Sequence, residues 1–329
     1  MTPMRSLRIE SVRKVFGDYN HNAFTDLCRF GDGLYLTFRS CPDGHGVANT
    51  AKVRVLSSPD GGDWEQVFEF SVPDRDTRDP HFLVFGDTLF VYTGTWLCPA
   101  GYEVRDINDH LGYGAWSSDG AAWNGPKSLE GTYGHYIWRA AAHGGKAYLC
   151  GRRKRDFVPV PKPEGGEVTE SALLESEDGL VWRFRACFQE TLGDETAFLF
   201  EDDGSILAVA RTLGGGPAQV CRSKPAYAEW MRTDLSRHVG GPLLVKWGER
   251  YLVGGRRSLK GQEPRTVLYW LVDDQLQEAL ELPSAGDNSY PGFIDMGDGH
   301  ALVSYYSCHE CTPDRSDRAC IYLAELALG

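Results

Sequence analysis

Six pairs of short apolar segments, each joined by a turn that contains glycine or aspartate, recur along this chain of 329 residues. Neighbouring turns lie between 45 and 59 residues apart, with centres near Gly31, Gly86, Gly144, Asp203, Gly248 and Gly297. This spacing is the length of four strands with their turns, and each pair of segments is typical of a β-hairpin. The repeat predicts an all-β fold, a six-bladed β-propeller with four-stranded antiparallel blades.

The fourth hairpin carries an acid and an arginine at its open end. Its two strands, Ala197–Phe200 and Ile206–Ala210, flank the turn Asp202-Asp203-Gly204 and lack polar alternation, so we expect both to be buried on both faces. Glu195 begins the first strand and Arg211 ends the second. The hairpin therefore predicts that a carboxylate and a guanidinium lie side by side.

A second repeat has the pattern Ser-x-Asp-Gly-x-x-Trp. It occurs at Ser58–Trp64, Ser117–Trp123 and Ser176–Trp182, with successive copies 59 residues apart, and in a decayed form at Ser223–Trp230. Serine and aspartate can hydrogen-bond the backbone of a tight turn, and glycine takes its unusual φ. We expect these turns to join the third and fourth strands of a blade, with the tryptophan packed between blades, because a feature repeated in several blades cannot mark a single site.

The ends of the chain predict how the ring closes. Ala319–Leu328 supplies only one further strand to the last blade, and Leu7–Phe16 is a strand without a blade. We expect the N-terminal strand to complete the sixth blade, which removes an open edge and makes residues 1–329 one propeller domain. Two segments, Trp96–His110 and Pro159–Gly166, are expected to be long loops over one face.

Composition excludes several classes of partner. The formal charge of −12 disfavours nucleic acid and anionic membranes, and no apolar run reaches 18 residues. Nine cysteines, scattered apart from one close cluster, and an N-terminus without an apolar leader region favour a cytoplasmic protein. The cluster Cys308-His309-Glu310-Cys311 lacks the spacing of a closed zinc site, so we expect neither a metal nor another cofactor. The sequence carries no signal for an oligomeric state.

The open ends of all six hairpins emerge on one face of a propeller, around its axis. Charged and polar side chains gather at these positions: Asn22, Asp26, Arg39, Arg78, Asp79, Arg139, Glu195, Arg211, Arg256, Arg257, Tyr290, His309 and Glu310. An acidic protein with arginines on one face, mixed with carboxylates and a tyrosine, is predicted to bind an anionic or polyhydroxylated ligand there. We therefore expect a carbohydrate ligand.

The chain resembles the sialidase superfamily of six-bladed propeller glycosidases. Its Ser-x-Asp-Gly-x-x-Trp turns resemble the Asp-box of that family, shortened by one residue. The family also carries a Glu and an Arg in one hairpin of the fourth blade, an Arg in the fifth and a Tyr early in the sixth. Glu195 with Arg211, Arg256 or Arg257, and Tyr290 stand in that order. The resemblance spans nearly the whole chain and implies an exo-acting glycoside hydrolase.

The resemblance also implies roles for these residues. Tyr290 would be the nucleophile and Glu195 the base that removes its proton, while Arg211 and Arg256 would hold a substrate carboxylate. The general acid would come from the loop after the first hairpin, where the chain offers Asp43 with His45 beside it.

Two departures from the family leave alternatives open. Where the family has Arg-Ile-Pro in its first blade, this chain has Asn22-Ala23-Phe24. Either Arg39 or Arg139 replaces the missing arginine, or the substrate is not a sialic acid. The second departure is Thr77-Arg78-Asp79-Pro80, which resembles the Arg-Asp-Pro element of five-bladed furanosidases and arabinanases.

That element defines a second mechanism. Asp26, Asp79 and Glu195 all begin innermost strands and would form a carboxylate set for acid/base hydrolysis without a tyrosine. The number of blades argues against it. A third possibility is a propeller without catalytic activity that binds a glycan or a protein on its arginine face, with Glu195 and Arg211 as a structural ion pair.

Overall fold

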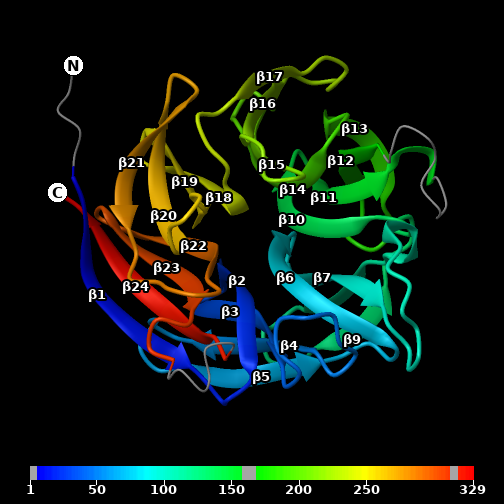
Figure 1. The fold of residues 1–329 in the computed structure, drawn as a ribbon, viewed down its shortest axis with the longest axis horizontal. Coiled ribbons are helices and arrows are strands. Elements are labelled where there is room, and N and C mark those ends of the chain that lie inside the picture. Colours follow the sequence, from blue (N-terminus) through cyan, green and yellow to red (C-terminus); the bar gives the residue numbers. More distant parts are fainter. Residues whose placement is uncertain (1–5, 158–167, 312–317) are drawn as a thin grey trace.

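Six sheets form a ring of blades in the computed structural model, which describes residues 6–157, 168–311 and 318–329 (Figure 1). Within these residues every sheet has four antiparallel strands. Blade I consists of β2 (His21–Phe30), β3 (Gly33–Cys41), β4 (Lys52–Ser58) and β5 (Glu65–Phe70). Blade II consists of β6 (Arg75–Phe85), β7 (Thr88–Leu97), β8 (Tyr113–Ser117) and β9 (Asn124–Ser128). Blade III consists of β10 (Tyr136–His143), β11 (Lys146–Lys154), β12 (Thr169–Ser176) and β13 (Arg183–Gln189). Blade IV consists of β14 (Gly193–Phe200), β15 (Ile206–Thr212), β16 (Gln219–Ser223) and β17 (Met231–Asp234). Blade V consists of β18 (Gly240–Trp247), β19 (Arg250–Arg257), β20 (Arg265–Val272) and β21 (Gln275–Glu281). Blade VI consists of β22 (Ser289–Gly297), β23 (His300–Ser307), β24 (Cys320–Leu328) and β1 (Leu7–Phe16). The predicted six-bladed propeller is confirmed.

The innermost strands of the blades line the axis of the ring. In order around it, β2, β6, β10, β14, β18 and β22 each contact the next, and β22 contacts β2 again. Most side chains in the fourth hairpin are buried, as the lack of polar alternation predicts: Ala197 and Val209 are 1% and 0% exposed, whereas Leu199 and Phe200, next to the turn, are half-buried. Apolar packing between blades therefore holds the innermost strands in fixed positions.

The N-terminal strand closes the ring. β1 pairs antiparallel with β24 as the outer strand of blade VI, from Leu7 opposite Leu328 to Phe16 opposite Ile321. Figure 1 shows β1 and β24 side by side. This closure agrees with the sequence prediction and leaves the sixth blade with the same four strands as the others.

The Ser-x-Asp-Gly turns join the third and fourth strands, as predicted. In the second copy, Gly120 N donates to Ser117 Oγ at 2.8 Å, and two further backbone N–H groups donate to Asp119 Oδ1. The Trp123 ring stacks on Phe68 of blade I at a centroid distance of 5.0 Å. These turns therefore lock a backbone conformation and join neighbouring blades, which is a structural role.

A β-bulge interrupts the innermost strand of every blade at the same place. The register between the two innermost strands shifts across two residues in each case: Phe24-Thr25, Asp79-Pro80, Trp138-Arg139, Asp194-Glu195, Gly241-Pro242 and Tyr290-Pro291. A bulge leaves a residue unpaired and re-aims its side chain. Six bulges therefore supply the side chains that surround the axis at one end of the ring.

Only short helical turns accompany the strands in the described part of the chain, η1 (Ile107–Asp109) and η2 (Arg155–Phe157). The first lies in the loop predicted at 96–110. The whole loop predicted at 159–166 lies outside the described residues. No helix among the described residues is long and apolar enough to cross a membrane. The described residues contain no disulfide.

Candidate functional site

Tyr290 and Glu195 meet at the axis, from blades VI and IV. Tyr290 Oη donates a hydrogen bond of 2.8 Å to Glu195 Oε1, and Arg211 Nη1 lies 2.9 Å from the same oxygen. The backbone N–H of Gly241 donates to Glu195 Oε2 at 2.9 Å. Arg256 Cζ lies 5.7 Å from the centre of the Tyr290 ring. We call Tyr290, Glu195, Arg211 and Arg256 the axial cluster.

The surroundings of Glu195 and Tyr290 keep the first ionised and the second neutral. Burial alone would raise the pKa of Glu195, but the charge and hydrogen bond of Arg211, with the donors Tyr290 and Gly241, hold it below its ordinary value. Burial and the Glu195 carboxylate raise the pKa of Tyr290 well above its ordinary value. The pair is therefore a carboxylate that accepts a hydrogen bond from a neutral phenol.

The bulges explain why this pair can form. Tyr290 has φ of 53° and Gly241 has φ of 59°, both in the left-handed region that side chains rarely occupy. A Cβ on Gly241 would lie 2.6 Å from the Tyr290 ring, so only glycine lets the phenol pack against blade V. Unfavourable backbone at a cluster of polar side chains is a common feature of functional sites.

Arg211 and Arg256, the two arginines of the axial cluster, are both partly accessible to solvent. Their side chains are 29% and 24% exposed. Arg211 pairs with Asp194 and Glu195, and Arg256 binds Asp287, the Asn288 carbonyl and Tyr306. The contacts among described residues leave Nη2 of Arg211 and Nη1 of Arg256 available to a ligand, which suits recognition of an anion.

Asp79 is a buried carboxyl near Glu195 and Tyr290. It is 5% exposed, Tyr136 Oη donates to its Oδ2, and its Oδ1 has no hydrogen-bond partner among the described residues. Burial raises the pKa of Asp79 to about 8, and the nearby charge of Glu195 adds to the effect while Arg78 opposes it. At neutral pH Asp79 is therefore a protonated carboxyl, able to donate a hydrogen bond.

This raised pKa predicts a pH-dependent stability. The folded protein holds the Asp79 proton up to about pH 8, whereas the unfolded chain loses it near its ordinary value of 3.8, so stability falls as pH rises between these values. We expect Asp79→Asn to be more stable than the unmodified protein at pH 7.5, with the difference growing by about 1.4 kcal/mol per pH unit from pH 5. Chemical denaturation at both pH values measures it; a difference independent of pH would contradict the raised pKa.

Arg39 and Arg78 do not offer their side chains to a ligand in the way the sequence suggested. Arg39 is completely buried: Nε donates to Asp76, and its two Nη atoms donate to the carbonyls of Gly44 and Gly46. Arg78 pairs with the same Asp76 at 2.9 Å and donates to the same loop. Their partners come from blade II and from the loop after β3, so these arginines position that loop.

Arg139 and Asp26 bind each other across the axis. Arg139 Nη1 lies 2.8 Å from Asp26 Oδ1, and its other nitrogens donate to the carbonyls of Pro242 and Pro291. Burial alone would raise the pKa of Asp26, but Arg139 and His81 hold it below its ordinary value. Asp26 is thus the partner of a buried arginine, and the nitrogens of Arg139 are bound to the Asp26 carboxylate and to the two carbonyls.

Five other candidates have their main contacts away from the axial cluster. Arg257 pairs with Glu278 and Glu281 on the outer strand of blade V. Asn22 is buried and bonds Asp18 and the carbonyls of Asn20 and Ala319. Glu310 pairs with Lys14, the His309 ring packs near Tyr322, and the exposed Asp43 accepts a bond from Thr50. Position along a hairpin could not reveal these contacts, because each depends on the direction of a side chain.

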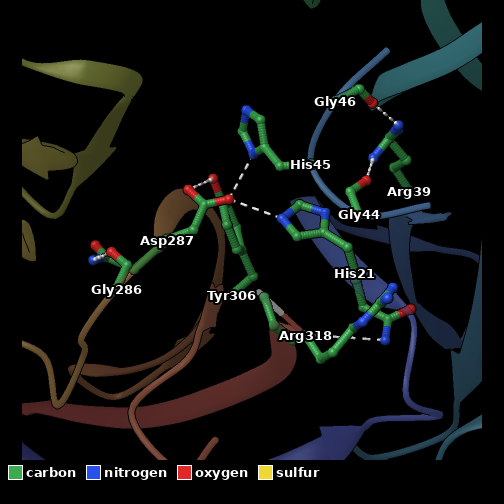
Figure 2. A network of polar contacts seen from close by, with 12 residues as sticks. His21, Arg39, Gly44, His45, Gly46, Gly286, Asp287, Tyr306 and Arg318 are labelled. Atoms are coloured by element: carbon green, nitrogen blue, oxygen red, sulfur yellow. Dashed lines mark hydrogen bonds and ion pairs between the residues drawn. The ribbon is translucent and has the colours of Figure 1, made fainter. Parts of the chain in front are cut away.

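Sequence reasoning missed an acidic group beside the cluster. Asp287, on the loop before β22, binds Arg256 and Tyr306 through Oδ1 and lies 2.8 Å from His21 Nε2 and 2.6 Å from His45 Nδ1 through Oδ2 (Figure 2). The polar run Asp287-Asn288-Ser289 directly before Tyr290 was the available signal.

A cavity of about 600 Å³ lies elsewhere, on the outer strands of blade IV. Lys224, Trp230 and Met231 are among its lining residues, and no member of the axial cluster contributes to it. Its lining is therefore separate from the site described above.

No protein-family model and no curated protein sequence matches the chain. Solved structures do match. A protein of unknown function from Dyadobacter fermentans superposes with a TM-score of 0.79 at 19% identity, covering 98% of this chain and 100% of that one. Trypanosoma rangeli sialidase in complex with sialic acid matches with a TM-score of 0.66 at 14% identity, and the endosialidase of phage phi92 with 0.65 at 10%.

These matches define the class of fold. They cover 99% and 97% of this chain but 57% of the trypanosomal chain and 69% of the phage chain, so the chain spans little more than half the length of the trypanosomal sialidase. The protein has the sialidase fold, and the resemblance predicted from the sequence is confirmed at that level. The sialic acid complex is a property of the trypanosomal protein.

Proposed function

We propose that this protein is an exo-acting glycoside hydrolase of the sialidase type, which cleaves a terminal acidic sugar from a glycan or glycoconjugate. The observation that carries the proposal is the buried hydrogen bond of 2.8 Å between Tyr290 Oη and Glu195 Oε1. A neutral phenol beside an ionised carboxylate suits attack on an anomeric carbon that bears a carboxylate, because the two approach without charge repulsion.

The first chemical step uses this pair directly. Tyr290 Oη bonds to the anomeric carbon while its proton moves to Glu195, the bond from that carbon to the departing oxygen breaks, and the departing oxygen takes up a proton from a general acid. In the second step water attacks the same carbon and gives a proton back to that group, and Tyr290 leaves and recovers its proton from Glu195. The neutral carboxyl of Asp79 donates a hydrogen bond to a sugar hydroxyl.

Arg211 and Arg256 support an acidic sugar as the substrate. Both flank Tyr290, both are partly exposed, and each keeps one terminal nitrogen available. Two arginines that converge on one carboxylate give stronger and more directional hydrogen bonds than neutral donors do. A neutral sugar would leave both nitrogens without a partner.

The test is a screen of the unmodified protein on aryl glycosides of 2-ulosonic acids, uronic acids and neutral hexoses, with release of the phenol as the measurement. We expect turnover of an acidic glycoside, and a value of kcat/KM about 100-fold lower for the matched substrate whose carboxylate is a carboxamide. Preference for the neutral hexosides would contradict the acidic substrate. Binding of acidic sugars without turnover of any glycoside would favour a glycan-binding propeller instead.

A further inference from the structure

His45 lies on the loop after β3 and faces Asp287. Its Nδ1 lies 2.6 Å from Asp287 Oδ2, and its side chain is 52% exposed. Figure 2 shows the second ring nitrogen pointing away from the carboxylate. Asp43, two residues earlier and the candidate for the general acid from sequence, instead accepts a hydrogen bond from Thr50.

The backbone of this loop is fixed on both sides of His45. Arg39 donates to the two flanking glycine carbonyls at 3.1 and 2.8 Å, and Arg78 donates to the carbonyl of His45 at 2.6 Å. Both arginines are paired with the buried Asp76. This arrangement holds the imidazole in place before any ligand binds, which is what a catalytic group on a loop requires.

The Phe24 ring packs against both His45 and the proposed nucleophile. Its centroid lies 5.7 Å from that of His45 and 4.8 Å from that of Tyr290. Tyr306, which donates to Asp287, packs with its ring centroid 5.9 Å from that of Tyr290. The imidazole and the nucleophile therefore share one aromatic neighbour.

Asp287 supplies the charge that such an imidazole needs. Burial alone would raise the pKa of Asp287, but hydrogen bonds from His21 and His45 and the charge of Arg256 hold it far below its ordinary value. Burial lowers the pKa of His21, so His21 stays neutral and donates to the same oxygen. An ionised carboxylate on Nδ1 orients the ring and fixes which nitrogen faces away from it, as in other acid–base pairs of histidine and aspartate.

We propose that His45, positioned by Asp287, is the general acid and base of the hydrolysis, in place of a carboxylate on this loop. This rests on the proposed function. His45 Nε2 gives its proton to the departing glycosidic oxygen as Tyr290 bonds to the anomeric carbon. In the second step Nε2 takes a proton from the attacking water, which restores the protonated imidazole.

The experiment compares two substrates with the same sugar, one with a 4-nitrophenol leaving group and one with an alkyl alcohol. A good leaving group departs without a proton, so we expect His45→Ala to lower kcat/KM by 10²- to 10⁴-fold on the alkyl glycoside and by less than about tenfold on the aryl glycoside. His300→Ala is the matched control, because His300 is equally exposed but pairs with Glu10 on the outer strand of blade VI.

The outcomes separate this proposal from the proposed function. If the unmodified protein hydrolyses neither substrate, the proposed function fails and the role of His45 with it. If the unmodified protein hydrolyses both substrates, and His45→Ala loses activity equally on both or on neither, only the role of His45 fails. If Asp79→Asn, and not His45→Ala, loses activity selectively on the alkyl glycoside, the general acid is Asp79 and the assignment to His45 is overturned.

A chelation experiment tests whether a metal ion takes part. Potential ligand atoms of His21, His45 and Asp287 lie within 4.8 Å of one another. A bound cation would need a lone pair on His45 Nδ1, whereas in the proposed role this nitrogen carries a proton. We expect unchanged turnover of both substrates after dialysis against a chelator. Loss of turnover that a divalent cation restores would overturn the proposed role.

Discussion

Tyr290→Phe is expected to lower kcat/KM by about 10³-fold or more on the best aryl glycoside found in the screen. The change removes a single oxygen, the one that would bond to the anomeric carbon, and keeps the ring that packs against Phe24 and Gly241. Loss of a nucleophile costs more than loss of a binding contact, because the enzyme then lacks the covalent path. Steady-state kinetics with the purified variant measure the effect.

The fold should survive this substitution. Glu195 keeps Arg211 and the Gly241 N–H as partners when the phenol oxygen is gone. We therefore expect the unfolding temperatures of Tyr290→Phe and the unmodified protein to differ by only a few degrees. Glu195→Gln is the matched variant on the other side of the hydrogen bond: it keeps the shape but cannot accept the proton, and should also lose activity.

A fluorinated glycosyl fluoride of the same sugar gives an independent readout. Fluorine beside the anomeric carbon slows release of a covalent intermediate, so intact-mass measurement should find one adduct per chain on the unmodified protein and none on Tyr290→Phe. Turnover that survives both substitutions would refute the proposed mechanism. An adduct on a residue other than Tyr290 would contradict the proposed nucleophile.

The blades could be predicted because their signals are local. A hairpin needs two apolar segments and a turn within some twenty residues, and the Ser-x-Asp-Gly turns form their hydrogen bonds within three residues, as between Gly120 and Ser117. Repetition then multiplies a weak signal by six. The same locality predicted that Glu195 and Arg211 meet, because one hairpin carries both.

The arginines show where sequence reasoning ends. Arg39, Arg139, Arg211 and Arg256 all lie at the open ends of hairpins, yet only the last two are partly exposed beside Tyr290. What separates them is how completely other groups enclose the guanidinium, as Asp76 and the carbonyls of Gly44 and Gly46 do for Arg39, and no local pattern encodes those contacts. The bulges do have a signal in the sequence. In three of the six, the second residue of the bulged pair is a proline, as in Tyr290-Pro291, because the strand needs no backbone N–H donor at that position.

Arg139→Met is expected to destabilise the protein by about 3–5 kcal/mol, the largest effect on stability that we predict for a single side chain. Arg139 comes from blade III and reaches Asp26 of blade I and the carbonyls of Pro242 and Pro291 in blades V and VI. Its loss leaves the buried Asp26 carboxylate without its cation and removes one contact shared by four blades. The free energy of unfolding from chemical denaturation measures the effect.

Two further variants decide whether the effect comes from the buried charge. Arg257→Met removes an arginine that the sequence placed in the same class, but its partners Glu278 and Glu281 are exposed, so we expect a change below about 1 kcal/mol. Adding Asp26→Leu to Arg139→Met removes the stranded carboxylate and should restore part of the lost stability, because an apolar pair can replace a buried ion pair. A double variant less stable than Arg139→Met alone would show that the carbonyl contacts across the axis, rather than the ion pair, hold these four blades together.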